Sequence, residues 1–213
     1  LPDVAWAVGR AGPPPFELAM SRMSFTSAFP AMTTTIAGVS VGNAEAAHHR
    51  AMTEIVAEIG AWERRFSRFR PESMLSRTNT AAGRWVSADD VFLDLLQIAR
   101  AAVFATDGRF NPAILPSLEA HGYDRTLDKI QVISRPISAV PDRDIGTDAW
   151  ADVAIDRAGK RVRLPPRMRI DLGGIAKGAL ADHLADRFPE WPGGAISNGG
   201  DLRVWGSPPD GEP

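Results

Sequence analysis

The sequence predicts an α+β fold in which helices pack with a mixed or antiparallel sheet. Two stretches carry apolar residues at helical spacing and are long enough for several turns. In the second half of the chain, short stretches with alternating apolar residues follow one another without a helix between them. A regular βαβ fold would alternate strands with helices, so this order favours α+β.

The N-terminal part divides into an expected arm and an extended stretch. Residues 1–24 are rich in proline and small residues, and we expect a flexible arm there. Residues 25–41 include the β-branched run MTTTIAGVSV and are expected to be extended. In a strand, Thr35, Ala37, Val39 and Val41 would share one face.

Two long helices are expected in the middle of the chain. Asn43 can cap the first, whose apolar positions are Met52, Ile55, Val56, Ile59, Trp62 and Phe66. The second has an N-terminal signal with Ser87 as the expected cap and Asp89 and Asp90 in the first turn. It is expected to end at Asp107-Gly108.

Short strands and a further helix are expected in the C-terminal part. Alternating apolar residues predict strands at 153–155, 162–164 and 168–172. A helix is expected over residues 175–188, followed by a strand that glycines interrupt.

Composition excludes several classes of function. The chain has 213 residues, 44% of them hydrophobic, and a net charge of −2, which is typical of a globular protein. Its arginines are scattered, so we expect no nucleic acid partner. The absence of cysteine excludes disulfides, thiolate metal sites and a cysteine nucleophile. No stretch approaches the roughly 20 apolar residues that span a bilayer.

The first residues give no sign of a secretion signal. Arg10 and the prolines at 13–15 interrupt the apolar residues, so we expect no signal peptide within residues 1–24. The chain begins with Leu1 rather than Met, which leaves an upstream leader open. Membrane association is therefore expected only through such a leader. The residues shown would by themselves indicate a cytoplasmic protein. Because an upstream leader is left open, the compartment is not assigned.

The stretch RIDLGGIAKGALADHL, residues 169–184, is the first candidate site. Asp171 lies at the end of an expected strand, and Gly173, Gly174 and Lys177 follow where a helix begins. Glycines allow a positive φ or a close approach to a ligand, and a helix N-terminus with a nearby lysine suits a phosphate. The residues alone leave another interpretation open, in which the glycines form a tight turn, Asp171 is a cap and Lys177 is solvated.

A second glycine-rich stretch, SNGGD at residues 197–201, is compatible with a shared anion pocket. A hairpin turn or β-bulge is the alternative for this stretch. The histidines have no metal-ligand spacing with one another or with a carboxylate, and we expect all of them to be structural or on the surface. They are His48, His49, His121 and His183.

Five segments in order resemble one family. They are AMTTT (31–35), FSRFRPESMLSRTN (66–79), DGRFNPAILPSLEAHGYD (107–124), RIDLGGIAKGALAD (169–182) and SNGGDLRVWG (197–206). This combination resembles the ApbE-type FAD:protein FMN transferases over roughly residues 25–210. The resemblance implies an ApbE-like, T-fold-like domain over residues 25–213, with the family's C-terminal part missing.

The resemblance also implies an activity. Enzymes of this family split the pyrophosphate of FAD, transfer the FMN part to a Ser or Thr hydroxyl of a target flavoprotein, and release AMP. They require Mg²⁺. FAD is therefore the implied substrate, Mg²⁺ the implied cofactor and an acceptor flavoprotein the implied partner. Family members often work outside the cytoplasm.

Individual residues match the family's site, although no catalytic residue is assigned. Phe69 takes the place of an aromatic residue that stacks on the flavin or adenine ring, and Gly174 matches a position whose backbone oxygen ligates the metal. The positions implied to contact FAD are Met32, Phe69, Arg109, Phe110, Asn111, Asp171 and Lys177.

The sequence departs from the family pattern in three respects. Thr33 stands where glycine is usual, and Asn111 stands where aspartate is frequent. The family's later His-x-x-Asp-Pro-x-Thr-Gly segment, and the Asp and Thr that complete its Mg²⁺ site, do not occur before Pro213. Two alternatives to a transferase therefore stay open: a non-catalytic FAD-binding module, and a half-protein that needs a partner chain. A reading frame that continued into those segments would favour the transferase.

Overall fold

The computed structural model describes residues 23–32, 34–125, 147–188 and 191–208. The chain divides into two compact units, one of residues 1–61 and 177–213 and the other of residues 62–176. The division falls within helices α1 (Glu45–Phe66) and α5 (Gly173–Ala185), so each helix contributes to both units. The expected arm lies outside the described residues except for Met23 and Ser24. None of the helices in the described ranges is both long and apolar enough to span a bilayer.

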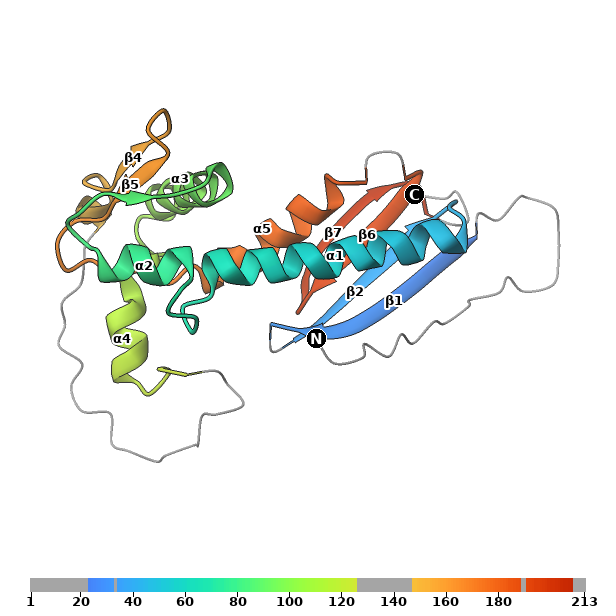
Figure 1. Ribbon diagram of the computed structural model, residues 1–213, viewed down its shortest axis with the longest axis horizontal. Helices are drawn as coiled ribbons and strands as arrows, with labels where there is room; N and C mark the ends of the chain where they lie inside the picture. Colours follow the sequence, from blue (N-terminus) through green and yellow to red (C-terminus); the bar gives the residue numbers. More distant parts are fainter. Residues whose placement is uncertain (1–22, 33, 126–146, 189–190, 209–213) are drawn as a thin grey trace. The chain divides into compact units, whose positions relative to one another are not determined.

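The first unit is built on a four-stranded antiparallel sheet with the strand order β1-β2-β6-β7 (Figure 1). The strands are β1 (Ser24–Ala31), β2 (Thr34–Val41), β6 (Gly193–Asn198) and β7 (Asp201–Gly206). The stretch expected to be extended is therefore a β-hairpin, and Met32, with a φ of 52°, lies in its turn. The antiparallel pairing of consecutive strands confirms the predicted α+β class.

The SNGGD stretch forms the hairpin turn between β6 and β7. Asn198 pairs with Asp201, which leaves Gly199 and Gly200 as the two turn residues. Their φ angles are 65° and 104°. Two-residue hairpins favour turns with positive φ, which glycine adopts without steric cost. The hairpin alternative for this stretch is the one that the structure forms.

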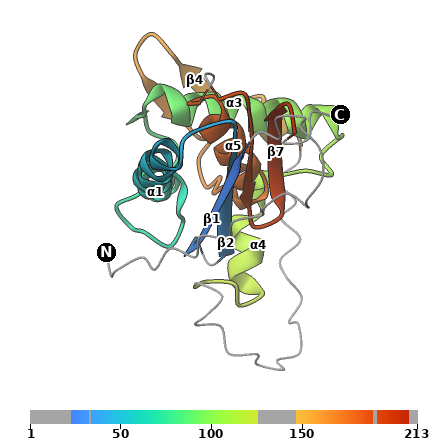
Figure 2. The same ribbon diagram turned by 90° about the vertical axis from the view of Figure 1, so that its right-hand side faces the viewer.

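Helix α1 packs along one face of this sheet (Figure 2). Gly38 of β2 lets the helix come close, because a Cβ there would lie 2.6 Å from Met52 Cε. Most of the apolar positions expected for this helix are buried: Met52, Ile55, Ile59, Trp62 and Phe66. Helix α1 begins at Glu45, and Asn43 donates a hydrogen bond back to the Val41 carbonyl instead of capping it.

A buried histidine connects α1 to two strands. His48 is fully buried, and its Nε2 lies 2.9 Å from Ser27 Oγ while its Nδ1 lies 2.8 Å from Ser40 Oγ. Burial lowers the pKa of His48; the neighbouring His49 lowers it further, and Glu45 raises it by less. His48 is therefore structural, one of the two roles that the sequence analysis allows for the histidines, and its burial disfavours the charged form.

The second unit combines short helices with a small sheet of strand order β3-β5-β4. Its elements are α2 (Met74–Thr80), β3 (Val86–Ser87), α3 (Asp90–Ala105), the 3₁₀ helix η1 (Pro112–Ile114), α4 (Leu115–Ala120), the 3₁₀ helix η3 (Thr147–Trp150), β4 (Ala154–Asp156) and β5 (Arg161–Arg163). The expected cap of α3 is wrong: Ser87 lies in β3, and Asp89 Oδ1 accepts the Phe92 N–H at 2.9 Å. The expected end at Asp107-Gly108 is correct, and both residues have a positive φ.

The strand predicted over residues 168–172 does not form. Met168, Ile170 and Leu172 are buried, as their alternation predicts, but the Asn79 side chain takes the place of a neighbouring strand. Asn79 Nδ2 donates to the Ile170 carbonyl and Asn79 Oδ1 accepts the Ile170 N–H, both at 2.9 Å. One amide thus satisfies both backbone groups of a buried residue.

We expect the stability of the first unit to fall in acid because of His48. The unfolded state binds a proton near pH 6.5 whereas the buried imidazole resists it, so this stabilisation is complete above that pH and is lost as the pH decreases. The slope should not exceed about 1.4 kcal/mol per pH unit. Urea unfolding monitored between pH 8 and pH 5 measures it.

The variant His48→Gln should remove that part of the pH dependence. His121→Gln is the matched control, because His121 is exposed. An unchanged slope in His48→Gln would contradict the assignment.

Candidate binding site

The start of helix α5 places Asp171, Gly173 and Gly174 together in the second unit. Asp171 Oδ1 accepts the Gly173 N–H at 2.6 Å, so this side chain caps the helix. Neither glycine has a positive φ, and both belong to α5, so the tight turn of the alternative interpretation does not form, although Asp171 is the cap which that interpretation included. Both glycines are close to neighbouring side chains, because a Cβ would lie 2.9 Å from Asp171 Oδ1 at position 173 and 3.3 Å from Phe110 Cε2 at position 174.

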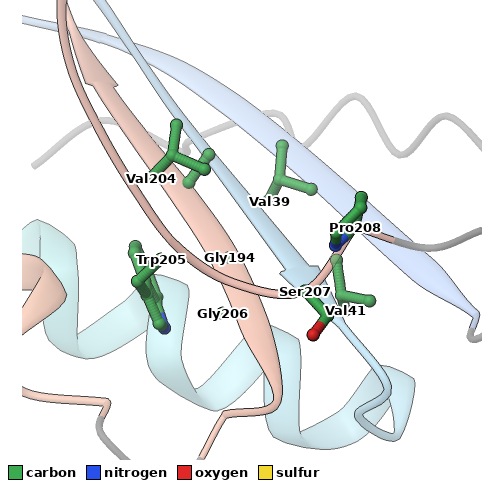
Figure 3. A pocket seen from close by; sticks show the side chains of 9 residues that line it. Val39, Val41, Gly194, Val204, Trp205, Gly206, Ser207 and Pro208 are labelled. Atoms are coloured by element: carbon green, nitrogen blue, oxygen red, sulfur yellow. The ribbon is translucent and has the colours of Figure 1, made fainter. Parts of the chain in front are cut away.

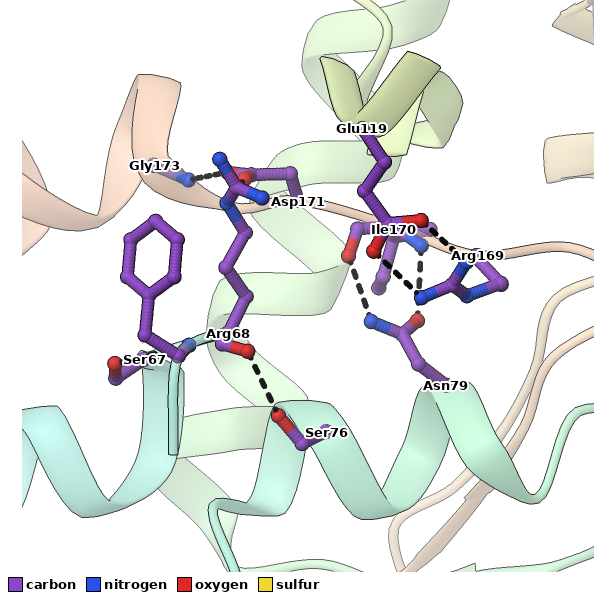
Figure 4. A network of polar contacts seen from close by, with 10 residues as sticks. Ser67, Arg68, Ser76, Asn79, Glu119, Arg169, Ile170, Asp171 and Gly173 are labelled. Carbon is purple, nitrogen blue, oxygen red and sulfur yellow. Dashed lines mark hydrogen bonds and ion pairs between the residues drawn. The ribbon is translucent and has the colours of Figure 1, made fainter. Parts of the chain in front are cut away.

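Arg68 is the direct partner of Asp171. Its Nε lies 2.7 Å from Asp171 Oδ2, and its side chain is only 7% exposed (Figure 4). The guanidinium carbon lies 4.3 Å from the Phe69 ring centroid and 4.2 Å from the Tyr123 ring centroid. Cation–π attraction to both rings strengthens where water is excluded. Arg68 thus lies against two aromatic rings and pairs with the carboxylate that caps α5.

The backbone on both sides of this ion pair is held by further polar contacts. Ser76 Oγ donates to the Arg68 carbonyl at 3.4 Å, and the Asp171 N–H donates to the Pro112 carbonyl at 2.8 Å. Arg169 forms a bidentate ion pair with Glu119 of α4, at 2.6 and 2.8 Å (Figure 4). These contacts fix the segment that carries Asp171.

The Arg109–Asn111 segment supplies one residue to this cluster. Phe110 lies against Gly174, whereas Arg109 is exposed. Asn111 Oδ1 accepts hydrogen bonds from Trp150 Nε1 at 2.9 Å and from the Ala113 N–H at 3.0 Å. Asn111 therefore has a structural role as the cap of η1, in addition to any role toward a ligand.

Met32 and Lys177 belong to the first unit. Both are half-buried, and the Lys177 carbonyl accepts a hydrogen bond from Asn198 Nδ2 at 3.2 Å. Thr33 lies outside the described residues. In the second unit, the structure brings Phe69, Phe110, Asp171 and Gly174 into one series of contacts.

Arg68, Tyr123, Asn79 and Trp150 were not identified from the sequence. The first three lie within the segments that carry the family resemblance, which is the one signal that singles them out.

Hydrogen bonds from Arg125 lower the pKa of Asp124 next to Tyr123, and the positive charge of Arg68 contributes a smaller part.

A Mg²⁺ site is not formed by the residues that the structure describes. They contain no group of three or more His, Asp or Glu side chains that could hold a metal ion. Mg²⁺ requires several oxygen ligands, whereas one oxygen of Asp171 already accepts the Gly173 N–H and the other is ion-paired with Arg68. Of the implied ligands, only the Gly174 backbone oxygen is present, and we derive no chemical step through the metal.

A cavity of about 380 Å³ lies on the sheet of the first unit (Figure 3). Its lining is apolar and contains none of the residues implied to bind FAD or metal. The lining residues are Val39, Val41, Gly194, Ala195, Val204, Trp205, Gly206, Ser207 and Pro208.

The geometry so far defines an α+β protein with a polar site at the start of a helix. The family model described as "ApbE family" matches residues 32–213. The chain belongs to the ApbE family. This confirms the family resemblance of the sequence.

One curated relative and several solved structures are similar to the chain. It is 30% identical over 145 residues to the FAD:protein FMN transferase of Klebsiella pneumoniae (strain 342). That match covers 64% of this chain and 43% of the relative, so the chain spans less than half of the relative's length.

The structural comparisons confirm the ApbE-like architecture. The flavinyl transferase ApbE of Pseudomonas stutzeri, in its apo form, matches with a TM-score of 0.76 at 23% identity, over 93% of this chain and 66% of that one. The flavin transferase ApbE of Vibrio cholerae gives 0.73 at 22% identity, over 90% and 62%. The ApbE protein of Thermotoga maritima gives 0.68 at 24% identity, over 87% and 60%. At these identities the likeness shows the fold alone.

We expect Asn79→Ala to destabilise the second unit by about 2–3 kcal/mol, because both backbone groups of buried Ile170 would lose their partner. Thr80→Ala, an exposed position in the same helix, should change the unfolding free energy by about 0.5 kcal/mol or less. Urea denaturation of the two variants measures the difference. Equal stability of both would show that Asn79 does not hold this segment.

Proposed function

We propose that the chain binds FAD at the start of α5 and serves in the transfer of its FMN moiety to a Ser or Thr hydroxyl of an acceptor flavoprotein, with release of AMP. Membership of the ApbE family and the name of the Klebsiella relative support this proposal. The observation that carries it is the capped, glycine-rich helix start beside Phe110, with Arg68 and Phe69 connected to it through Asp171.

The helix start has the properties that a diphosphate needs. Gly173 and Gly174 are exposed, and in the described part of the chain the Gly174 N–H has no acceptor. The N-terminus of a helix of 13 residues carries a partial positive charge that favours an anion. The Gly173 N–H is already bonded to Asp171, so the exposed Gly174 N–H is the group that a phosphate oxygen can approach.

Asp171 and Phe69 are proposed to hold the other parts of FAD. One oxygen of the Asp171 carboxylate accepts the Gly173 N–H and the other is ion-paired with Arg68, and each keeps a lone pair that can accept from a hydroxyl or a base. Phe69 has the Arg68 guanidinium over its ring, so a flat ligand ring can stack on its other face. Met32, Lys177, Arg109 and Asn111 remain proposed FAD contacts on the strength of the resemblance alone.

Catalysis would rest on position and charge. Phosphoryl transfer requires an in-line arrangement of the attacking hydroxyl and stabilisation of the charge on the phosphorus oxygens. The α5 start and the guanidinium of Arg68 lie where they can contribute to the second requirement. The requirement for Mg²⁺, with the Gly174 carbonyl as one ligand, is part of the proposal, as is a single transferase domain over residues 25–213.

A second candidate is a module that binds FAD without cleaving it. The observation that favours it is the lack of an acidic cluster among the residues described here. The two candidates differ in AMP release and in covalent flavin on an acceptor, and both require FAD binding.

One experiment separates them. The chain is incubated with FAD, Mg²⁺ and an acceptor flavoprotein, with and without EDTA, and flavin fluorescence is measured on the denatured acceptor. Covalent flavin and free AMP that both disappear with EDTA are the expected results. FAD binding without either product would instead establish the non-catalytic module.

We expect Asp171→Ala to lower FAD affinity about tenfold or more, because a hydrogen bond to a charged group is lost at a largely buried position. Lys177→Ala should lower it by about fivefold or less, since a solvent-screened lysine contributes modestly. Fluorescence titration measures both. Asp186→Ala, an exposed position just after α5, is the control. Unchanged affinity in a folded Asp171→Ala variant would exclude the role proposed for Asp171.

A further inference from the structure

Arg68 has a buried donor without an acceptor. Its Nε is ion-paired with Asp171 Oδ2 at 2.7 Å, whereas its Nη2 is buried and has no hydrogen-bond partner among the residues that the structure describes. Arginine stays protonated in proteins, so this N–H₂ group cannot relieve its burial by losing a proton. Unpaired buried donors are rare in native structures, and a bound ligand, ion or water is one explanation for such a donor.

The guanidinium is held in place before any ligand binds. Phe69 and Tyr123 both contact it, Asp171 holds its Nε, and Ser76 holds its backbone carbonyl. An arginine on the surface would lose much of its side-chain entropy on binding, whereas this side chain is 7% exposed and already ordered. Arg68 is thus a preorganised donor.

The α5 start lies directly beside this donor. Asp171 bridges the two, with one oxygen on Arg68 Nε and the other on the Gly173 N–H (Figure 4). Gly174 follows Gly173 in the chain, and its N–H has no acceptor among the described residues. The helix start also carries a partial positive charge. The charges of Arg68 and Asp171 compensate each other, and Asp124 is paired with Arg125. Asp171 and Asp124 thus each have an arginine as ion-pair partner, which lowers their repulsion of an incoming anion.

We infer that Arg68 is a phosphate-binding residue, whose Nη2 donates to a phosphate oxygen of a nucleotide bound at the α5 start. The guanidinium geometry matches phosphate oxygens, and a charge-assisted hydrogen bond of this kind is among the stronger ones. The identity of the nucleotide as FAD rests on the proposed function, whereas the preference for phosphate rests on the contacts of Arg68 alone.

The test compares ligands with and without phosphate. Riboflavin, FMN, FAD and inorganic pyrophosphate are titrated by fluorescence or calorimetry into the wild-type chain, Arg68→Met, Arg68→Lys and Arg70→Met. Arg70 is the matched control, because it lies two residues away and is exposed, with ion pairs to Glu63 and Glu72. Thermal denaturation establishes that each variant folds.

In Arg68→Met we expect the affinity for FAD, FMN and pyrophosphate to fall about tenfold or more, while riboflavin affinity stays within about twofold. Arg68→Lys keeps the charge but loses the planar fork, and its loss should be smaller and again confined to the phosphate-containing ligands. If Arg68→Met does not fold, the Lys variant decides. Arg70→Met should bind every ligand as the wild type does.

The other outcomes separate the two proposals. Equal losses for riboflavin and FAD, unchanged affinities, or tighter FAD binding in Arg68→Met would overturn the role of Arg68 and leave FAD binding intact. Pyrophosphate binding that depends on Arg68, in a chain that binds no flavin, would keep the role of Arg68 and overturn the proposed function. A wild-type chain that binds none of the ligands would overturn both.

Discussion

The carboxylate of Asp171 connects the parts of the site in the second unit. One oxygen caps helix α5 through the Gly173 N–H, and the other holds Arg68 Nε. Because Arg68 lies against Phe69 and Tyr123, this one side chain relates the helix start to both rings. A buried ion pair adds little net stability once desolvation is counted, so the main effect of the pair is to fix geometry.

Three of the five segments that resemble the family meet around this carboxylate, in the order 66–79, 107–124 and 169–182. The first supplies Arg68 and Asn79, which hold Asp171 and Ile170 respectively. The next supplies the Pro112 carbonyl, which accepts the Asp171 N–H, and the Tyr123 ring. Residues that are far apart in the sequence thus fix the position of Ile170 and Asp171, which precede α5. In the described residues these contacts come from side chains and turns, and no strand ladder contributes to them.

The spacing of apolar residues correctly predicted those helices and strands that bury one face in the core. The apolar spacing from Met52 to Phe66 gave a long helix because its positions face a core. The same reasoning failed at residues 168–172, since alternating burial does not require a partner strand when a side-chain amide satisfies the backbone. The cap of α3 was misplaced by two residues because Ser87 and Asp89 are both good caps.

The candidate site was predictable in part. Asp171, the glycines and Phe69 lie in segments whose composition or family resemblance singles them out. Nothing local distinguishes Arg68 from Arg70, because the burial of Arg68 depends on the Tyr123 ring, which lies 55 positions further along the chain (123 − 68 = 55). The limited space beside position 174 is likewise set by Phe110. Such tertiary neighbours are not visible in a single sequence.

A crystal structure of the chain with FAD tests the central claim most directly. The account predicts a phosphate oxygen about 3 Å from Arg68 Nη2, the diphosphate at the Gly173–Gly174 helix start and an FAD ring against Phe69. FAD seated in the apolar cavity beside Val39 and Trp205, with Arg68 Nη2 still without an acceptor, would contradict it.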